Sequence, residues 1–179
     1  MSHSMTKYEK QKCLSLFILS LLLSIAISTV TYGQVAEKEP ALSVEGEVQQ
    51  ILTLHTADLA KMHRMEIRAT DKDEKEHHFS GFRLSDILQQ AGVTLGAQLR
   101  GKNMTKYLLA RSGDGYQVIF ALAEIDSSFT DRTILVADQV DGHPLPTGKG
   151  PFQMVVPGEK KHARWIWGLT TLIVRSAKE

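Results

Sequence analysis

The chain's single cysteine lies just ahead of a charge-free apolar run near the N-terminus, and these two features constrain the fold more than any other. Cys13 precedes the run from Leu14 to Ile27, and three lysines come before both: Lys7, Lys10 and Lys12. Basic residues followed by a short apolar stretch are typical of a secretory signal peptide. The run has roughly 14 residues, fewer than the ~20 that cross a bilayer core. We therefore expect residues 1–33 to be a signal peptide.

Small residues after the apolar run suit signal peptidase, and they place cleavage after Gly33, with Ala36 as the second choice. The segment before the run has no Arg-Arg pair, so export is expected to follow the general secretory route in an unfolded state. Lipidation is not expected, because Cys13 comes before the run rather than after it. The predicted location is periplasmic or secreted, and an uncleaved N-terminal anchor is the alternative.

The exported chain would contain no cysteine, which limits what can hold it together. Disulfides, a thiolate metal ligand and a cysteine nucleophile are all excluded. Roughly 145 residues remain, enough for one ordinary domain that buries a real core. We predict a linker at residues 34–41 and a single domain at residues 42–175.

The charges of the chain exclude one class of partner. There are 21 Lys and Arg residues against 20 Asp and Glu residues, and the densest charge run, residues 71–76, alternates in sign. Nucleic-acid binding needs a strongly basic face. We expect no nucleic-acid partner and, once the signal peptide is removed, no membrane partner.

Alternating apolar and polar residues predict a strand-rich domain with two or three short helices. Helical spacing is expected at 57–62, 84–91 and 122–125, with Gly92 placed to end the second helix. Regular βαβ alternation is missing, which favours an α+β fold with mostly antiparallel or mixed sheets. The strands are predicted at residues 42–48, 51–54, 65–69, 77–80, 107–111, 116–120, 134–137, 152–156 and 165–174.

Common catalytic motifs are missing from the sequence. It contains no Gly-x-Ser-x-Gly elbow, Walker loop, dinucleotide fingerprint or His-Glu-x-x-His helix. The histidines of the exported chain show no recognised metal-ligand spacing, so no metal site is predicted. His77 and His78 are adjacent in a predicted strand and would point to opposite faces.

The segment from Gly148 to Trp165 combines a glycine-rich approach, an apolar strand and a basic exit loop. Flexible backbone and clustered cations of this kind can hold an anion. The alternative is that the cations only solubilise a loop between two strands. The candidate binding residues here are Gly148, Gly150, Lys160, Lys161, His162 and Arg164.

Three motifs in one order resemble the sulfite-oxidase-type molybdopterin-binding domain family. They are Phe82-Arg-Leu-Ser-Asp-Ile-Leu-Gln-Gln-Ala-Gly92, Ser112-Gly-Asp-Gly-Tyr116, and Gly150-Pro-Phe-Gln-Met-Val-Val-Pro-Gly158 followed by Arg164-Trp165. The resemblance covers nearly all of residues 42–174. It implies the family's α+β fold, molybdopterin as the cofactor, and oxidoreductase chemistry. It also implies that Arg164 stands near the pterin phosphate.

Departures from the family pattern bear on that chemistry. Family enzymes hold molybdenum through a cysteine located before the helix at 84–91, and residues 64–80 contain none. An arginine is common where this chain has Gln153, and a small residue is usual at the position of His162. A general secretory signal would also carry the chain across the membrane without a preloaded cofactor.

We therefore expect an exported relative that uses the family cleft to bind a pterin-like or other anionic ligand, or a protein partner, without molybdenum–thiolate catalysis. The residues expected to contact the ligand are Gln153, Lys160, Lys161, His162 and Arg164, with Gly148 and Gly150 allowing close backbone approach. One alternative is a molybdenum-cofactor oxidoreductase in which His77, His78 or Asp114 serves as an outer ligand. Another is a structural or interaction domain that exposes Trp165 or Trp167.

Overall fold

A computed structural model describes residues 41–177 of the chain. The predicted signal peptide and nearly all of the predicted linker lie outside the described residues. Two short α-helices, α2 (Thr56–Leu59) and α3 (Leu84–Gln90), are joined by 3₁₀ turns and strands. The strands of residues 41–177 are β1 (Ala41–Gly46), β2 (Leu52–His55), β3 (Arg64–Thr70), β4 (Glu76–Arg83), β5 (Lys106–Ser112), β6 (Gln117–Ala121), β7 (Leu135–Val140), β8 (His143–Pro144), β9 (Gln153–Val155) and β10 (Leu169–Ser176).

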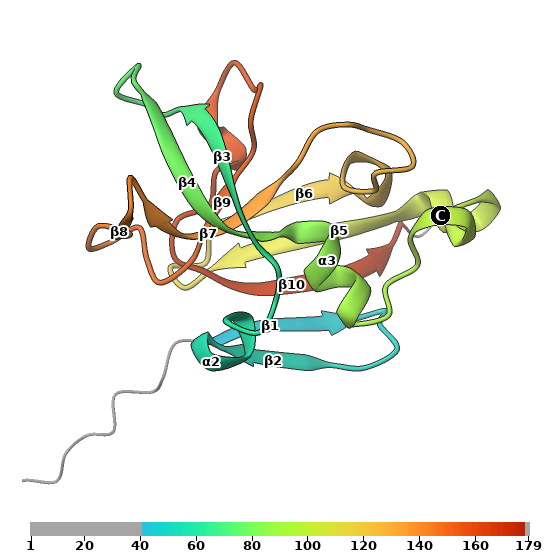
Figure 1. Ribbon diagram of the computed structural model, residues 1–179. Coiled ribbons are helices and arrows are strands. Elements are labelled where there is room, and N and C mark those ends of the chain that lie inside the picture. Colours follow the sequence, from blue (N-terminus) through green and yellow to red (C-terminus); the bar gives the residue numbers. More distant parts are fainter. Residues whose placement is uncertain (1–40, 178–179) are drawn as a thin grey trace, which may run out of the picture. The chain divides into compact units, whose positions relative to one another are not determined.

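The first sheet has the strand order β2-β1-β10-β5-β6. Its pairs are antiparallel except for β1 and β10, which run parallel although they come from the two ends of the domain (Figure 1). The first and last strands of the domain are thus neighbours in this sheet. Because their pairing is parallel and the other pairs are antiparallel, the sheet is mixed, as predicted from the missing βαβ alternation.

The second sheet has the order β3-β4-β7-β8, and β9 pairs with β7 beside β8. A bulge separates Ser80 from Gly81 where β4 meets β7. A Cβ atom at Gly81 would lie 2.1 Å from the carbonyl oxygen of Val136, so only glycine permits this close strand approach. The bulge and the glycine fix how the end of β4 turns into α3.

The hydrophobic core lies between the two sheets and under α3. Four phenylalanines, Phe79, Phe82, Phe120 and Phe152, are almost completely buried. Burial of a side chain of this size contributes about 1.5–3 kcal/mol. No cysteine occurs in the described residues, so this packing and the backbone hydrogen bonds hold the domain together.

The α+β fold with mixed sheets and few helices is confirmed, but several element boundaries differ from the prediction, most clearly those of the last strand and of the first helix. The last strand begins at Leu169 and not at Trp165, because Trp165 turns back to donate its backbone N–H to His162 and Gly168 adopts a positive φ of 58°. The first helix ends at Leu59 instead of reaching residue 62. The second helix is close to its prediction, and Gly92, with φ of 70°, follows its end.

Within residues 41–177, no helix has the length and apolarity needed to cross a bilayer.

Candidate ligand-binding site

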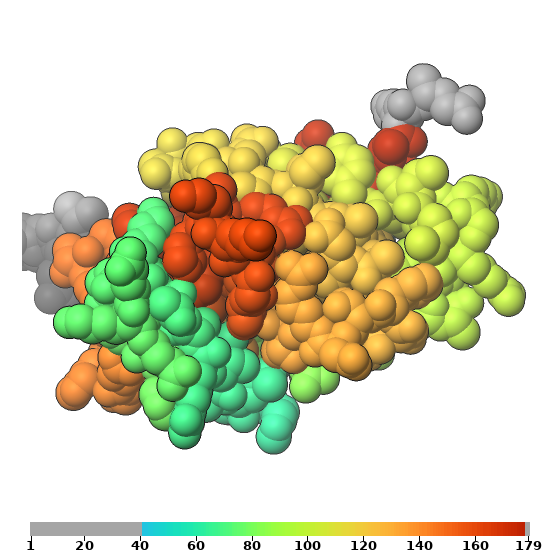
Figure 2. Space-filling model, turned by 90° about the horizontal axis from the view of Figure 1, so that it is seen from above, coloured from blue at the N-terminus to red at the C-terminus, as the bar shows by residue number. Residues whose placement is uncertain are grey.

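Two adjoining pockets lie where the β3–β4 hairpin tip, the β7–β8 turn and the loops around β9 meet. They share Lys72 and Trp167, and we call them together the Trp167 cleft. Their volumes are about 270 and 310 Å³. In the space-filling view the loop before β10 lies between the β3–β4 hairpin and the β5–β6 region (Figure 2). The first pocket is lined by Asp71, Lys72, Asp73, His77, Phe79, Val140, Pro146, Lys149, Gln153 and Trp167; the second is lined by Lys72, Ser112, Asp114, Tyr116, His162, Ala163, Trp165 and Trp167.

Gln153 is the most unusual side chain of the cleft. It begins β9, is fully buried at 0% exposure, and lines the first pocket. Its Oε1 and Nε2 atoms are both buried, and neither has a hydrogen-bond partner in the described part of the chain. Burying an amide without partners costs about 1–3 kcal/mol. The amide of Gln153 therefore has one donor group and one acceptor atom without partners at the wall of the first pocket.

A partly buried ion pair forms the next part of the wall. The Lys149 ammonium lies 2.9 Å from the carboxylate of Asp71, which is 8% exposed. Burial alone would raise the pKa of Asp71, but the Lys149 ammonium and the backbone N–H of Lys72 together lower it below its ordinary value. Asp71 is therefore ionised and holds the β3–β4 tip against the loop before β9.

Positive charge gathers around the Trp167 ring. The Nζ atoms of Lys72 and Lys149 lie 4.3 and 4.9 Å from its centroid, within the range of cation–π attraction. Lys72 is exposed and forms no ion pair with any residue that the structure describes. The Lys72 ammonium is thus available to an anion at the junction of the two pockets.

The second pocket is closed by aromatic residues held by specific hydrogen bonds. His162 Nε2 lies 2.8 Å from the carbonyl oxygen of Thr70, which fixes Nε2 as the donor, and its ring meets Trp165 edge-on at 4.5 Å. Trp165 donates Nε1–H to the carbonyl of Val156, and Tyr116 donates its hydroxyl to Ala163. The walls of this pocket are therefore preorganised.

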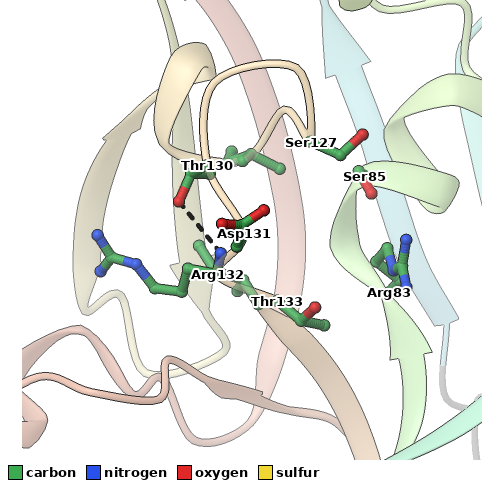
Figure 3. Close-up of a pocket in the computed structure, with 9 residues that line it drawn as sticks. Arg83, Ser85, Ser127, Thr130, Asp131, Arg132 and Thr133 are labelled. Carbon is green, nitrogen blue, oxygen red and sulfur yellow. Dashed lines mark hydrogen bonds between the residues drawn. The ribbon is translucent and has the colours of Figure 1, made fainter.

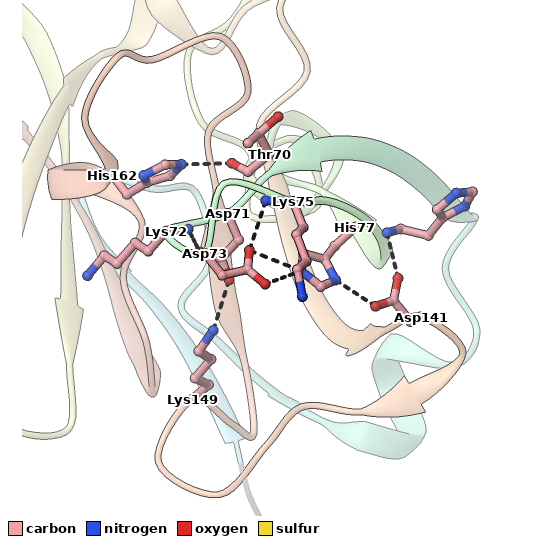
Figure 4. A network of polar contacts seen from close by, with 10 residues as sticks. Thr70, Asp71, Lys72, Asp73, Lys75, His77, Asp141, Lys149 and His162 are labelled. Carbon is pink, nitrogen blue, oxygen red and sulfur yellow. Dashed lines mark hydrogen bonds and ion pairs between the residues drawn. The ribbon is translucent and has the colours of Figure 1, made fainter.

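His77 bridges two carboxylates at the edge of the first pocket (Figure 4). Its Nδ1 lies 2.6 Å from Asp141 and its Nε2 lies 3.1 Å from Asp73. Hydrogen bonds with Asp141 first, and then with Asp73, raise the pKa of His77 above its ordinary value. Sequence analysis missed this bridge, although the four-residue spacing from Asp73 to His77 was visible; Asp141 is distant in sequence and reaches His77 only through the β7–β8 turn.

Arg164, the predicted phosphate contact, is engaged inside the protein. Its Nε donates to Glu159 at 2.8 Å, its Nη1 lies 2.9 Å from Glu124, and its guanidinium lies 4.4 Å above the Phe120 ring. Lys160 and Lys161 are exposed and line neither pocket. Of the side chains predicted to contact a ligand, the structure brings only Gln153 and His162 to the cleft.

The two predicted glycines lie in the loop that supports Trp167. Gly148 has a positive φ of 86° in the turn after Pro146, and Gly150 precedes a cis proline. Between them, Lys149 accepts the backbone N–H of Gly168 at 2.9 Å. The glycines shape the cleft through this loop, and neither lines a pocket.

The cleft offers polar groups for an organic ligand and no protein ligand set for a metal. His77 lines one pocket, Asp114 lines the other, and His78 pairs with Glu66 instead. Among residues 41–177, no group of three His, Cys, Asp or Glu side chains is placed to hold a metal ion. The orphaned Gln153 amide and the cations near Trp167 fit the pterin part of a molybdopterin, whereas residues 41–177 supply no thiolate for its metal.

These features define an α+β domain with a two-part cleft whose lining is partly polar and partly apolar. The chain belongs to the oxidoreductase molybdopterin binding domain family, whose model matches residues 67–178. The resemblance drawn from the three sequence motifs is thereby confirmed.

A solved structure supports the same fold. The crystal structure of the sulfane dehydrogenase SoxCD from Paracoccus pantotrophus is similar with a TM-score of 0.60 and 21% sequence identity. The match covers 75% of this chain and 38% of that chain, so this chain spans less than half of its neighbour's length. Among curated proteins, none matches the sequence.

Proposed function

We propose that this protein binds a molybdopterin-type ligand, with a pterin ring system and an anionic tail, in the Trp167 cleft. The observation that carries the proposal is Gln153, whose buried amide presents a donor and an acceptor to the first pocket without partners of its own. The polar edge of a pterin carries donors and acceptors side by side, so it would satisfy both Gln153 atoms at once.

The rest of the cleft supports the same ligand class. Phe79, Val140 and Pro146 supply apolar walls around Gln153 in the first pocket, and flat heteroaromatic ligands favour mostly apolar pockets with a few placed polar groups. Lys72 stands at the junction of the two pockets and would take the anionic tail. The volume of each pocket alone is near the lower end of the ~300–1,000 Å³ that is typical of ligand sites. A ligand with a ring system and a tail would therefore need both pockets.

Two versions of this function differ in the metal. The family and the fold support a molybdenum-cofactor oxidoreductase, in which the bound cofactor supplies a redox-active metal held by its own dithiolene. The lack of a cysteine after residue 13 instead supports a relative that binds the pterin or another anion without molybdenum. In both versions the chain's own residues hold and orient the ligand: Gln153 at the ring edge, Lys72 at the tail.

A third hypothesis, an interaction domain that uses its tryptophans, predicted an apolar patch without a polar cleft. Trp165 is buried, and Trp167, which is 37% exposed, lines both pockets of a cleft that also contains charged and amide side chains. We therefore favour ligand binding. The predicted export to the periplasm or the exterior belongs to this proposal, and secretion assays of the full-length chain would test it.

Tryptophan fluorescence tests ligand binding directly. The chain has two tryptophans, and only Trp167 lies at the rim of both pockets. Titration with a phosphorylated pterin is expected to quench the emission, while Gln153→Met abolishes binding measured by calorimetry. Gln117→Met, on the exposed strand β6, serves as the matched control. Equal affinity of the wild type and Gln153→Met would contradict the proposal.

Metal analysis separates the two versions. Protein purified from its native compartment with stoichiometric molybdenum and dye-linked reductase activity would establish the oxidoreductase. Protein that carries a pterin but no molybdenum would establish the metal-free binder.

The double variant Arg164→Gln/Lys160→Gln tests the prediction from the sequence that these two cations contact the ligand. If the double variant binds the ligand as tightly as the wild type, neither residue belongs to the binding site.

A further inference from the structure

A second hollow lies at the opposite end of β4 from the Trp167 cleft, between the start of α3 and the loop of residues 125–134 (Figure 3). Its volume is about 170 Å³, below the ~300 Å³ at which pockets for drug-sized molecules begin. Its walls are mostly polar. The side chains that matter are Arg83, Ser85, Ser127, Asp131 and Thr133, and we call this site the Arg83 hollow.

Arg83 carries an unsatisfied charge into this hollow. It is the last residue of β4, its side chain is partly buried, and its Nε is buried without a hydrogen-bond partner. Its guanidinium forms no ion pair with any residue in the described range. An arginine offers a planar fork of donors that matches a carboxylate. Leaving the Nε–H of Arg83 buried without a partner is unfavourable unless something else binds it.

A negative charge stands on the facing wall. Figure 3 shows Asp131 and Thr133 on the loop side of the hollow, and Arg83 and Ser85 on the side where β4 leads into α3. Asp131 also forms no ion pair within residues 41–177, and it is not close enough to Arg83 to make one. Arg132, its neighbour, turns away and pairs with Glu159. Two opposite charges without ion-pair partners, the part-buried Arg83 and the exposed Asp131, therefore line opposite walls of a small polar space.

Hydrogen bonds along its walls hold the hollow open. The backbone N–H of Leu84 donates to Ile134 at 3.0 Å and joins the two walls at their base. Asp126, which is 3% exposed, accepts the N–H of Ser128 at 2.8 Å and caps the facing loop. Arg132 donates its N–H to the Thr130 hydroxyl at 3.1 Å. The separation of the two charges is thus set by the fold.

We propose that the Arg83 hollow binds a small zwitterion of the α-amino-acid class. Its carboxylate bonds to the Arg83 fork, and its ammonium bonds to Asp131 and to the Ser85 oxygen, whose own hydrogen is donated to Asp86. The Thr133 hydroxyl accepts or donates the remaining hydrogen bond. A simple anion would bind Arg83 but would be repelled by Asp131. A simple cation would bind Asp131 but would be repelled by Arg83. The small volume restricts the side chain of the ligand. This site is independent of the ligand proposed for the Trp167 cleft.

The experiment uses NMR titration of the ¹⁵N-labelled protein with three probes: glycine, acetate and methylamine. The Arg83 Nε–H resonance reports on the site directly. Glycine is expected to shift it and to bind about tenfold or more tightly than either half-molecule probe. Arg83→Gln is expected to weaken glycine binding by about tenfold or more, while the exposed control Arg68→Gln leaves it unchanged.

A second variant distinguishes a zwitterion site from an anion site. Asp131→Asn is expected to weaken glycine binding and to strengthen acetate binding, because it removes the repelling carboxylate. Glycine that binds no more tightly than acetate in the wild type would overturn the proposal. So would glycine affinity that survives Arg83→Gln, provided that the amide spectrum shows the variant to be folded.

Discussion

Replacing Gln153 with methionine separates the stability of the protein from its binding function. In the ligand-free protein the Gln153 side chain is fully buried, and both of its polar atoms lack partners among the described residues. Methionine has nearly the same length and volume, so the change removes the unpaired donor and acceptor without opening a cavity. The variant should therefore be more stable than the wild type.

The magnitude follows from the desolvation of the amide. An unsatisfied buried polar group costs about 1–3 kcal/mol in proteins, and Gln153→Met is expected to recover a gain of that size in the free energy of unfolding. For a domain of this size the gain corresponds to a rise in Tm of about 3–10 °C. The exposed control Gln117→Met should change the free energy of unfolding by less than about 0.5 kcal/mol.

Chemical denaturation of ligand-stripped protein measures this difference. The reasoning requires that the stability of Gln153→Met rise while its affinity for a phosphorylated pterin falls. A variant that is less stable than the wild type would show that the amide has partners in the free protein, and it would remove the physical basis for a ligand at Gln153.

Three further predictions concern the residues around the cleft. Lys149→Met leaves the Asp71 carboxylate buried without its cation and is expected to lower the free energy of unfolding by about 2–3 kcal/mol. Denaturation of this variant and of the double variant with Asp71→Asn measures the difference. An equal loss of stability in the single and the double variant would refute the prediction. His77 should titrate by NMR above its ordinary pKa of about 6.5, and Asp141→Asn should lower that pKa. The folded-state pKa of His77 is raised and that of Asp141 is lowered, so the bridge stabilises the fold at pH values between the ordinary pKa of an aspartate and that of a histidine. This contribution is lost as the pH rises through the folded His77 pKa or falls through the folded Asp141 pKa. Stability that does not change between about pH 5 and 9 would contradict this. Arg164→Gln is expected to destabilise the domain by leaving Glu159 and Glu124 without their shared cation, as thermal unfolding would show, and an unchanged Tm would refute it.

The fold was predictable because its signals are local. Apolar spacing marks α3, glycine-containing turns mark the hairpin between β5 and β6, and the order of three motifs indicated the family. The strand predicted across Trp165 and Trp167 failed because alternation alone cannot distinguish a strand from an irregular loop. In the folded chain, the Trp165 indole bonds to Val156 and Gly168 takes a left-handed conformation, and neither is visible as a local pattern.

The candidate site was only partly predictable, because its groups come together from distant segments. Asp71 and Lys149 are 78 residues apart, and the alternating charges of residues 71–76 did not mark Asp71 as part of a site. Arg164 was assigned to the ligand from its place in a motif, but its partners Glu159 and Glu124 depend on how the loop folds over β6. The unsatisfied state of Gln153 depends on the register of β9 against β7, which no composition argument fixes.

The pterin content of the protein purified from its native compartment tests the central claim most directly. We predict that the wild type carries a near-stoichiometric pterin, detected by the fluorescence of its oxidised form after release, and that Gln153→Met purified in parallel carries far less. A wild-type protein that is folded, correctly located and free of pterin would contradict the account.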